Sequence, residues 1–131
     1  MKKWALLCLL GLSVLVLAAP ASAATANFQG FCDGYPLDCV FDPQRTPSGQ
    51  TGTACPGSSV KRYFWDFGDG SSTFKTPPPH QTGHTYSGVS IWDVCLTVFC
   101  NDNTSATKCH CVSNSVGLPY CILAGAGWGP P

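Results

Sequence analysis

The sequence predicts an all-β protein in which two small antiparallel sheets pack as a sandwich. Three observations lead to this prediction. Short segments of alternating apolar and polar residues are separated by turn-forming residues, and no eleven-residue window after position 23 shows helical periodicity. In addition, 14 of the 131 residues are Gly and 11 are Pro, a composition that favours turns and short strands over long helices. The length fits one domain.

The first strands are expected in the N-terminal half of the chain. Residues 27–42 carry apolar side chains on both sides of a turn-forming stretch and predict one or two short strands. Residues 60–67 place Tyr63, Trp65 and Phe67 on one face of a strand. Three large apolar side chains on one face indicate that this face belongs to the core.

The clearest strand covers residues 91–99. Large apolar residues occupy every second position: Trp92, Val94, Leu96 and Val98. A polar turn over residues 101–106 follows, and residues 107–112 then return as the partner strand of a hairpin. We therefore expect one face of this hairpin to lie in the core.

Two further segments predict loops. Residues 46–59 are rich in Pro, Gly, Ser and Thr, which is typical of a loop. Residues 71–81 contain Pro77, Pro78 and Pro79, and Pro cannot donate a hydrogen bond to a sheet, so this segment belongs to a sheet edge or a connection.

The N-terminus has the pattern of a cleavable signal peptide. Lys2 and Lys3 form a basic region, residues 4–19 are almost wholly apolar, and small residues occupy positions 21–23. Cleavage after Ala23 predicts a secreted protein, extracellular or periplasmic, with no membrane association once the signal is removed. The expected organisation is a signal peptide at 1–23, a β-sandwich domain at 24–115 and a Gly- and Pro-rich tail at 116–131, loosely ordered and attached through Cys121.

The cysteine count supports export. The chain has nine cysteines, and the one at position 8 lies in the signal peptide. The eight that remain predict four disulfides in an oxidising compartment: Cys32, Cys39, Cys55, Cys95, Cys100, Cys109, Cys111 and Cys121.

Charge argues against a nucleic-acid partner. The chain has 7 Lys and Arg residues, 7 Asp residues and no Glu, and only 11% of its residues are charged. A nucleic-acid binder would be expected to have a strongly basic balance.

Three motifs occur in order along the chain. Residues 65–70 read Trp-Asp-Phe-Gly-Asp-Gly, residues 84–86 read His-Thr-Tyr, and residues 92–98 form an alternating apolar strand. In this combination residues 27–112 resemble the PKD (polycystic kidney disease) domain family. The resemblance implies an immunoglobulin-like β-sandwich stapled by disulfides, with no catalytic activity and no cofactor, used as an extracellular spacer or binder of proteins or polysaccharides.

Most of these motif residues have an expected structural role. Trp65 would anchor the core beside Phe67, and Tyr86 would donate a hydrogen bond back to the backbone. Asp66 and Asp69 would accept from backbone donors in the turn, where Gly68 and Gly70 provide the required backbone freedom. The resemblance assigns His84 to the same structural signature.

The same side chains have possible chemical roles. Asp66, Asp69 and His84 would form a metal or acid-base cluster only if the turn brought them together, and the structural role is favoured. The carboxylates are too scattered for a calcium loop. Cys109-His110-Cys111 lacks the paired spacing of a zinc site, so no metal site and no catalytic residue are expected.

The disulfide pattern is only partly constrained. Cys32 and Cys39 lie on consecutive elements and match paired cysteines of similar PKD domains, so their bond is the first choice. Cys100 ends one arm of the final hairpin, which favours a cross-strand bond to Cys109 or Cys111. Cys55, Cys95 and Cys121 would then pair among themselves and with the remaining hairpin cysteine.

Aromatic residues outside the core are the candidate binding surface. If Trp65 faces inward, Phe64 faces outward, and by the same parity so does Phe99, while Phe74 lies in a loop beside Lys75. Such a patch would suit a protein or polysaccharide partner, unless a disulfide or the tail covers it. The alternative function is a small disulfide-rich secreted inhibitor or effector.

Overall fold

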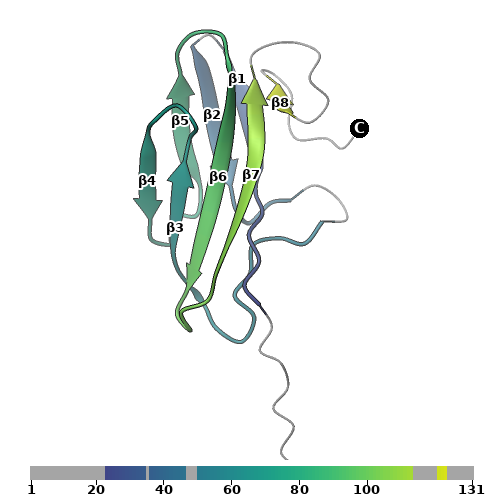
Figure 1. The fold of residues 1–131 in the computed structure, drawn as a ribbon, viewed down its shortest axis with the longest axis vertical. Helices are drawn as coiled ribbons and strands as arrows, with labels where there is room; N and C mark the ends of the chain where they lie inside the picture. The colour runs from purple at the N-terminus through teal and green to yellow at the C-terminus, as the bar shows by residue number, and fades with distance from the viewer. Residues whose placement is uncertain (1–22, 35, 47–49, 114–120, 124–131) are drawn as a thin grey trace, which may run out of the picture.

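The computed structural model describes residues 23–34, 36–46, 50–113 and 121–123. These residues form eight β-strands in two sheets that face each other (Figure 1). The expected signal peptide, apart from Ala23, and most of the expected tail lie outside the described residues. Within the described ranges, no helix is long and apolar enough to cross a membrane. The architecture confirms the predicted all-β sandwich.

The smaller sheet contains three antiparallel strands in the order β1-β2-β5: β1 (Gln29–Asp33), β2 (Leu37–Asp42) and β5 (Thr82–Tyr86). The first two are the pair expected within residues 27–42. Gly34, with a φ of +80°, lies between them, in the left-handed region that glycine adopts without steric cost. The sequence pattern alone predicts no separate strand at β5.

The larger sheet contains five strands in the order β4-β3-β6-β7-β8: β3 (Val60–Asp66), β4 (Ser72–Lys75), β6 (Ile91–Cys100), β7 (Ser105–Ser113) and β8 (Cys121–Leu123). All neighbours are antiparallel except β7 and β8, which are parallel. The short strand β4 forms one edge and ends before the Pro run. The strand β8 lies in the segment expected to be a tail.

The core fills the space between the sheets. Strand alternation turns one face of β3 and β6 inward, and Trp65 is fully buried against Phe28 and Phe41, with ring centroids 4.9 and 5.7 Å away. The other buried apolar side chains from both sheets include Leu37, Tyr63, Phe67, Tyr86, Trp92, Val94, Leu96, Val98 and Val112. The predicted core faces of residues 60–67 and 91–99 are therefore confirmed.

Disulfides connect the strands in a pattern that differs in part from the expected one. The favoured Cys32–Cys39 bond is present and crosses β1 and β2 with a Cα–Cα distance of 4.0 Å. The expected bond from Cys100 to Cys109 or Cys111 is wrong. Instead, Cys95 bonds to its direct partner Cys109, also with a Cα–Cα distance of 4.0 Å.

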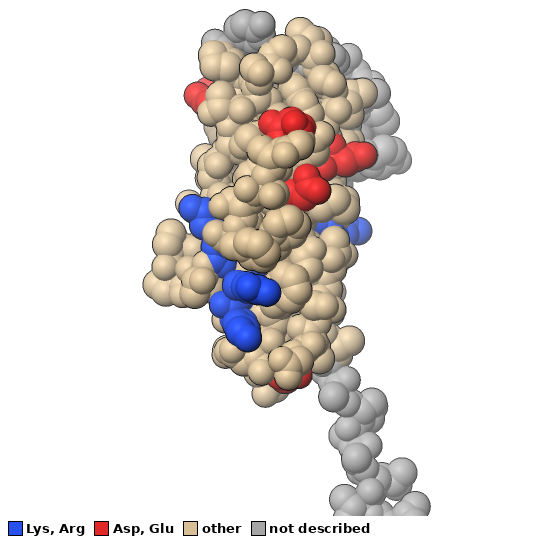
Figure 2. Space-filling view, turned by 60° about the vertical axis from the view of Figure 1, so that its left-hand side comes forward, with Lys and Arg blue, Asp and Glu red and all other residues tan. Residues whose placement is uncertain are grey.

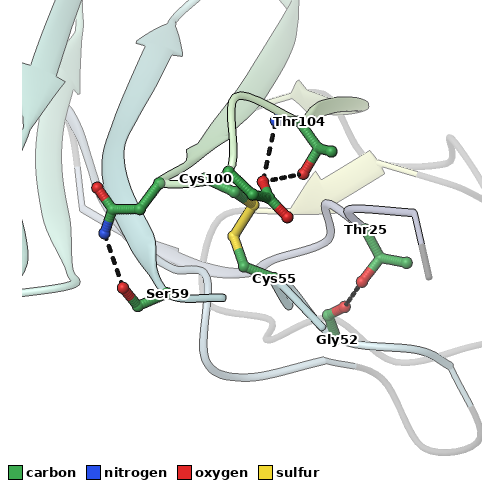
Figure 3. Close-up of a disulfide and its surroundings, with 8 residues drawn as sticks. Thr25, Gly52, Cys55, Ser59, Cys100 and Thr104 are labelled. Atoms are coloured by element: carbon green, nitrogen blue, oxygen red, sulfur yellow. Dashed lines mark hydrogen bonds between the residues drawn. A yellow bond between two sulfur atoms is a disulfide. The ribbon is translucent and has the colours of Figure 1, made fainter. Parts of the chain in front are cut away.

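The pleat of β6 explains this correction. Cys100 is buried on the inner face, whereas Cys95 and Cys109 belong to the outer face, so no bond joins Cys100 to Cys109 through the sheet. Cys100 instead bonds to Cys55, in the loop that precedes β3 (Figure 3). Cys111 is also disulfide-bonded, and its Cα is in register with that of Cys121.

Candidate binding surface

The outer face of β3, β4 and β6 carries the three aromatic residues singled out in the sequence. Phe64 pairs directly with Phe74 across β3 and β4, and Arg62 pairs with Phe99 across β3 and β6. Phe74 therefore lies in a strand, not in a loop as expected. The reason is that four residues of β4 pair with β3 before the Pro run prevents further pairing.

These side chains contact one another around one cation. The rings of Phe64 and Phe74 are 4.7 Å apart between centroids. The guanidinium carbon of Arg62 lies 4.8 Å from the Phe74 ring centroid and 4.9 Å from that of Phe99, within the range of cation–π attraction. We call Arg62, Phe64, Phe74 and Phe99 the aromatic face. Phe74 is 56% exposed, and Phe64 and Phe99 are half-buried.

A β-bulge places two exposed cations in succession beside this face. The register between β3 and β6 shifts between Val60 and Arg62, so Lys61 is an extra residue on β3. The shift lets Val60 pack against the core while Lys61 and Arg62 are both exposed. Sequence reasoning missed Arg62, although its parity with Phe64 would have placed it on the outer face.

The polar motif residues form a separate cluster at the turn after β3. Asp66 accepts a hydrogen bond from the Gly68 backbone N–H at 3.0 Å, and Asp69 accepts from the backbone and hydroxyl of Ser71. His84 Nε2 lies 2.7 Å from Asp69 Oδ2. The His84 ring also stacks on Phe67 with centroids 4.0 Å apart. The structure thus brings Asp69 and His84 together, whereas Asp66 binds the turn backbone.

Hydrogen bonds decide the charge of Asp69. Burial opposes ionisation of this carboxyl group, but the hydrogen bonds from Ser71 and His84 outweigh burial and lower its pKa to about 2. Within the described ranges, no group of three or more His, Cys, Asp or Glu side chains is placed to hold a metal ion. The geometry is that of a hydrogen-bonded turn.

Tyr86 connects this turn to the other sheet. Its hydroxyl donates to the backbone carbonyl of Phe67 at 2.9 Å, and its ring is buried against Trp92 with centroids 4.3 Å apart. Burial, assisted by the nearby carboxylates of Asp69 and Asp66, raises the pKa of Tyr86. The phenol therefore stays neutral and fixes the turn against β5.

His110 lies on the opposite side of β7 from its cysteine neighbours. Cys109 and Cys111 are both disulfide-bonded. His110 Nε2 contacts Asn27 Oδ1 at 2.9 Å, and its ring packs on Phe28 with centroids 4.7 Å apart. This placement separates His110 from the two sulfur atoms with which it would have to converge in a zinc site.

A pocket of about 250 Å³ lies on the outer face of the smaller sheet. Phe31 and Val40, which pair across β1 and β2, line it and are 50% and 47% exposed. At its rim the Asp42 carboxylate accepts from Gln81 at 2.8 Å and pairs with Arg45 at 3.5 Å. Sequence reasoning missed this feature, although the parity of Phe31 with the buried Cys32 would have indicated an outward ring.

Comparisons with known proteins match the geometry. The PKD domain family model matches residues 40–113, more than half of the chain. The PKD1 domain of the Vibrio cholerae metalloprotease PrtV superposes with a TM-score of 0.53 at 20% identity, covering 70% of this chain and 96% of that one. The PKD1 domain of Vibrio anguillarum Epp gives 0.54 at 18% identity, with coverages of 71% and 94%. No curated protein matches the chain. The chain belongs to the PKD domain family.

Proposed function

We propose that this protein is a secreted, non-catalytic module that binds an extracellular protein or polysaccharide through the aromatic face. The observation that carries the proposal is the convergence of Phe64, Phe74 and Phe99 around Arg62 on the outside of a sheet. Phe74 stands exposed on an edge strand, and an exposed aromatic cluster suits stacking on a sugar ring or contact with an apolar patch.

Rigidity supports this role. The face is built on paired strands, and the Cys95–Cys109 bond joins β6 to β7 within the same sheet. Side chains that are ordered before binding lose little conformational entropy on binding. The solved domain from Vibrio cholerae is part of a metalloprotease, which is consistent with this fold acting beside a catalytic unit and not as one.

Export is supported by two independent features. The N-terminal 23 residues have the pattern of a signal peptide. The described domain contains three disulfides between described cysteines, and such bonds persist in oxidising compartments such as the periplasm or the extracellular medium. A secreted module would meet polysaccharides and matrix proteins directly.

A binding assay tests the proposal with a matched pair of variants. The secreted, oxidised chain is incubated with immobilised polysaccharides and matrix proteins, and its affinity for each is measured. Phe74→Ala should weaken binding by about tenfold or more, because it removes the most exposed ring of the aromatic face. Phe31→Ala is the control, since it removes a similarly exposed ring from the other sheet and should change affinity by less than about twofold.

Three outcomes would contradict the proposal. Failure to bind any immobilised partner would remove its basis. A larger loss in Phe31→Ala than in Phe74→Ala would place the site in the pocket of the smaller sheet. Inhibition of a protease panel that does not depend on Phe74 would instead favour a disulfide-rich inhibitor.

A further inference from the structure

The basic residues are unevenly distributed over the domain. Of the cations in the described ranges, Lys61 and Arg62 lie in succession on β3, next to and within the aromatic face, whereas Lys75 on the neighbouring β4 pairs with the inward-facing Tyr63. Figure 2 shows Lys and Arg gathered over the middle and lower part of this side of the molecule, with Asp residues concentrated towards its upper end. The near-zero formal net charge therefore conceals a separation of charge along the sheet.

These cations are not neutralised within the described part of the chain. Its two ion pairs join Arg45 to Asp42 and His84 to Asp69. Arg62 instead lies over two aromatic rings, an arrangement that leaves its positive charge uncompensated by any carboxylate. An uncompensated basic patch attracts an anionic ligand.

The aromatic rings restrict the chemistry of that ligand further. A sugar ring presents an apolar C–H face that stacks on an aromatic side chain, and Phe74 is exposed enough to accept it. A carboxylate or sulfate on the same sugar would reach the guanidinium of Arg62, which lies 4.8 Å from the Phe74 centroid. A sugar chain with one negative charge per ring would thus contact both the aromatic rings and the guanidinium of Arg62.

We infer that the ligand of the aromatic face is an acidic polysaccharide, a chain of sugar rings that carry carboxylate or sulfate groups. This inference rests on the proposed binding function and specifies its ligand. Phe64, Phe74 and Phe99 supply the stacking surface, while Lys61 and Arg62 supply the charge. A pocket that could accept a protruding protein side chain lies on the other sheet, whereas the aromatic face presents rings on three neighbouring strands, which suits a row of sugar rings.

Paired probes test the charge requirement. Polygalacturonate carries a carboxylate on every ring, and its fully methyl-esterified form has the same rings without charge. The full secreted chain should bind the acid form at least about tenfold more tightly. Raising the salt concentration from about 0.05 to 0.5 M should weaken this binding, because the cations are exposed and salt screens their attraction to the carboxylates. Equal affinity for the two forms would overturn the inference.

Charge-removing variants locate the interaction. Arg62→Gln should lower affinity for polygalacturonate by about five- to tenfold, and Lys61→Gln by a smaller factor. Lys108→Gln is the matched control, because Lys108 is also exposed but lies on β7, where it pairs with the inward-facing position of Leu96. Melting temperatures establish that each variant is folded. A loss of affinity in Lys108→Gln equal to that in Arg62→Gln would overturn the inference by showing a nonspecific charge effect.

Two further probes test the requirement for sugar rings. Polyglutamate presents carboxylates without rings, and a short single-stranded DNA presents phosphates with bases. Binding of either as tight as that of polygalacturonate would overturn the assignment to acidic sugars. Tight binding to neutral polysaccharide that is lost in Phe74→Ala would overturn only this inference and leave the proposed function intact. Binding to nothing at all would overturn both.

Discussion

The two faces of the larger sheet use the same strands for different purposes. On β3 the inward Tyr63 and Trp65 are buried, whereas the outward Arg62 and Phe64 are exposed or half-buried. On β6 the inward Leu96 has no exposed surface, and the outward Phe99 lies beneath Arg62. Backbone geometry is shared, so the difference lies in what each side chain contacts.

This difference teaches where aromatic residues contribute to stability and where they are available for binding. Trp65 contacts rings from the opposite sheet and from the N-terminal segment. Phe64, by contrast, contacts Phe74 on the neighbouring strand of its own sheet. Only the inner ring joins the two layers. We therefore expect inner-face changes to unfold the domain and outer-face changes to leave it folded.

The largest effect is expected from Trp65→Ala. The indole is fully buried between Phe28 and Phe41, and its truncation leaves a cavity that the two disulfide-stapled sheets cannot close. The free energy of unfolding of the oxidised protein should fall by about 3 to 5 kcal/mol. Denaturant titration followed by circular dichroism measures the change. A loss below about 1 kcal/mol would show that the inner face is not the stabilising one.

The second largest effect concerns the turn that ends β3. Gly68 has a φ of +76°, and a Cβ at this position would lie 2.6 Å from the Asp93 backbone oxygen. Gly68→Ala should therefore cost about 2 to 4 kcal/mol, combining backbone strain with a clash. Gly70→Ala is the control, because φ is +89° but no atom lies within 4 Å of its Cβ. It should cost only about 1 kcal/mol, and equal losses in both variants would contradict the role of the Asp93 contact.

The third effect is a pH dependence that originates on the inner side of β7. Burial, assisted by the positive charge of Lys108, lowers the pKa of His110 to about 4 from its ordinary value of 6.5. Because the unfolded chain takes up this proton first, stability is complete above about pH 6.5 and declines as the pH falls towards 4. Partial exposure limits the loss to about 1 to 3 kcal/mol.

Denaturation measured at several pH values separates His110 from the other titrating groups. His110→Gln should flatten the stability profile between pH 6.5 and 4, since Gln keeps a donor for Asn27 without a titrating ring. The lowered pKa of Asp69, about 2, acts in a different window: its contribution is present above about pH 4 and is lost as the pH falls through 2. An unchanged slope above pH 4 in His110→Gln would argue against this assignment.

The sequence predicted the inner face better than the outer one. Alternation of large apolar residues marks β3 and β6, because a buried face requires a period of two. Strand β5 lacks that signal, since Gly83 interrupts it and only Thr82 and Tyr86 are buried. Strand β4 has four residues, and its phenylalanine points outward. Such short edge strands form through pairing with a neighbour, which local sequence does not encode.

The outward position of individual residues of the candidate site could be predicted, but their association could not. Parity placed Phe64 and Phe99 outside, yet their association with Phe74 and Arg62 depends on the register of β4 and β6 against β3. Register also decides the disulfides: Cys95 bonds to Cys109 because the two are direct partners across β6 and β7. The register of β6 against β7 follows from the turn between them, and that of β6 against β3 also from the bulge at Lys61, neither of which residue spacing alone specifies.

The smallest effect on stability is expected from Phe64→Ala, the outward counterpart of Trp65→Ala. The Phe64 ring is half-buried against Phe74 on the adjacent strand, so its removal creates no enclosed cavity and should lower the free energy of unfolding by about 1 kcal/mol or less. Its effect should appear instead as weaker binding to the immobilised ligand, measured on the same folded sample. A destabilisation equal to that of Trp65→Ala would remove the distinction between the two faces, because the outer rings would then be part of the core's support and not a surface left free for a ligand.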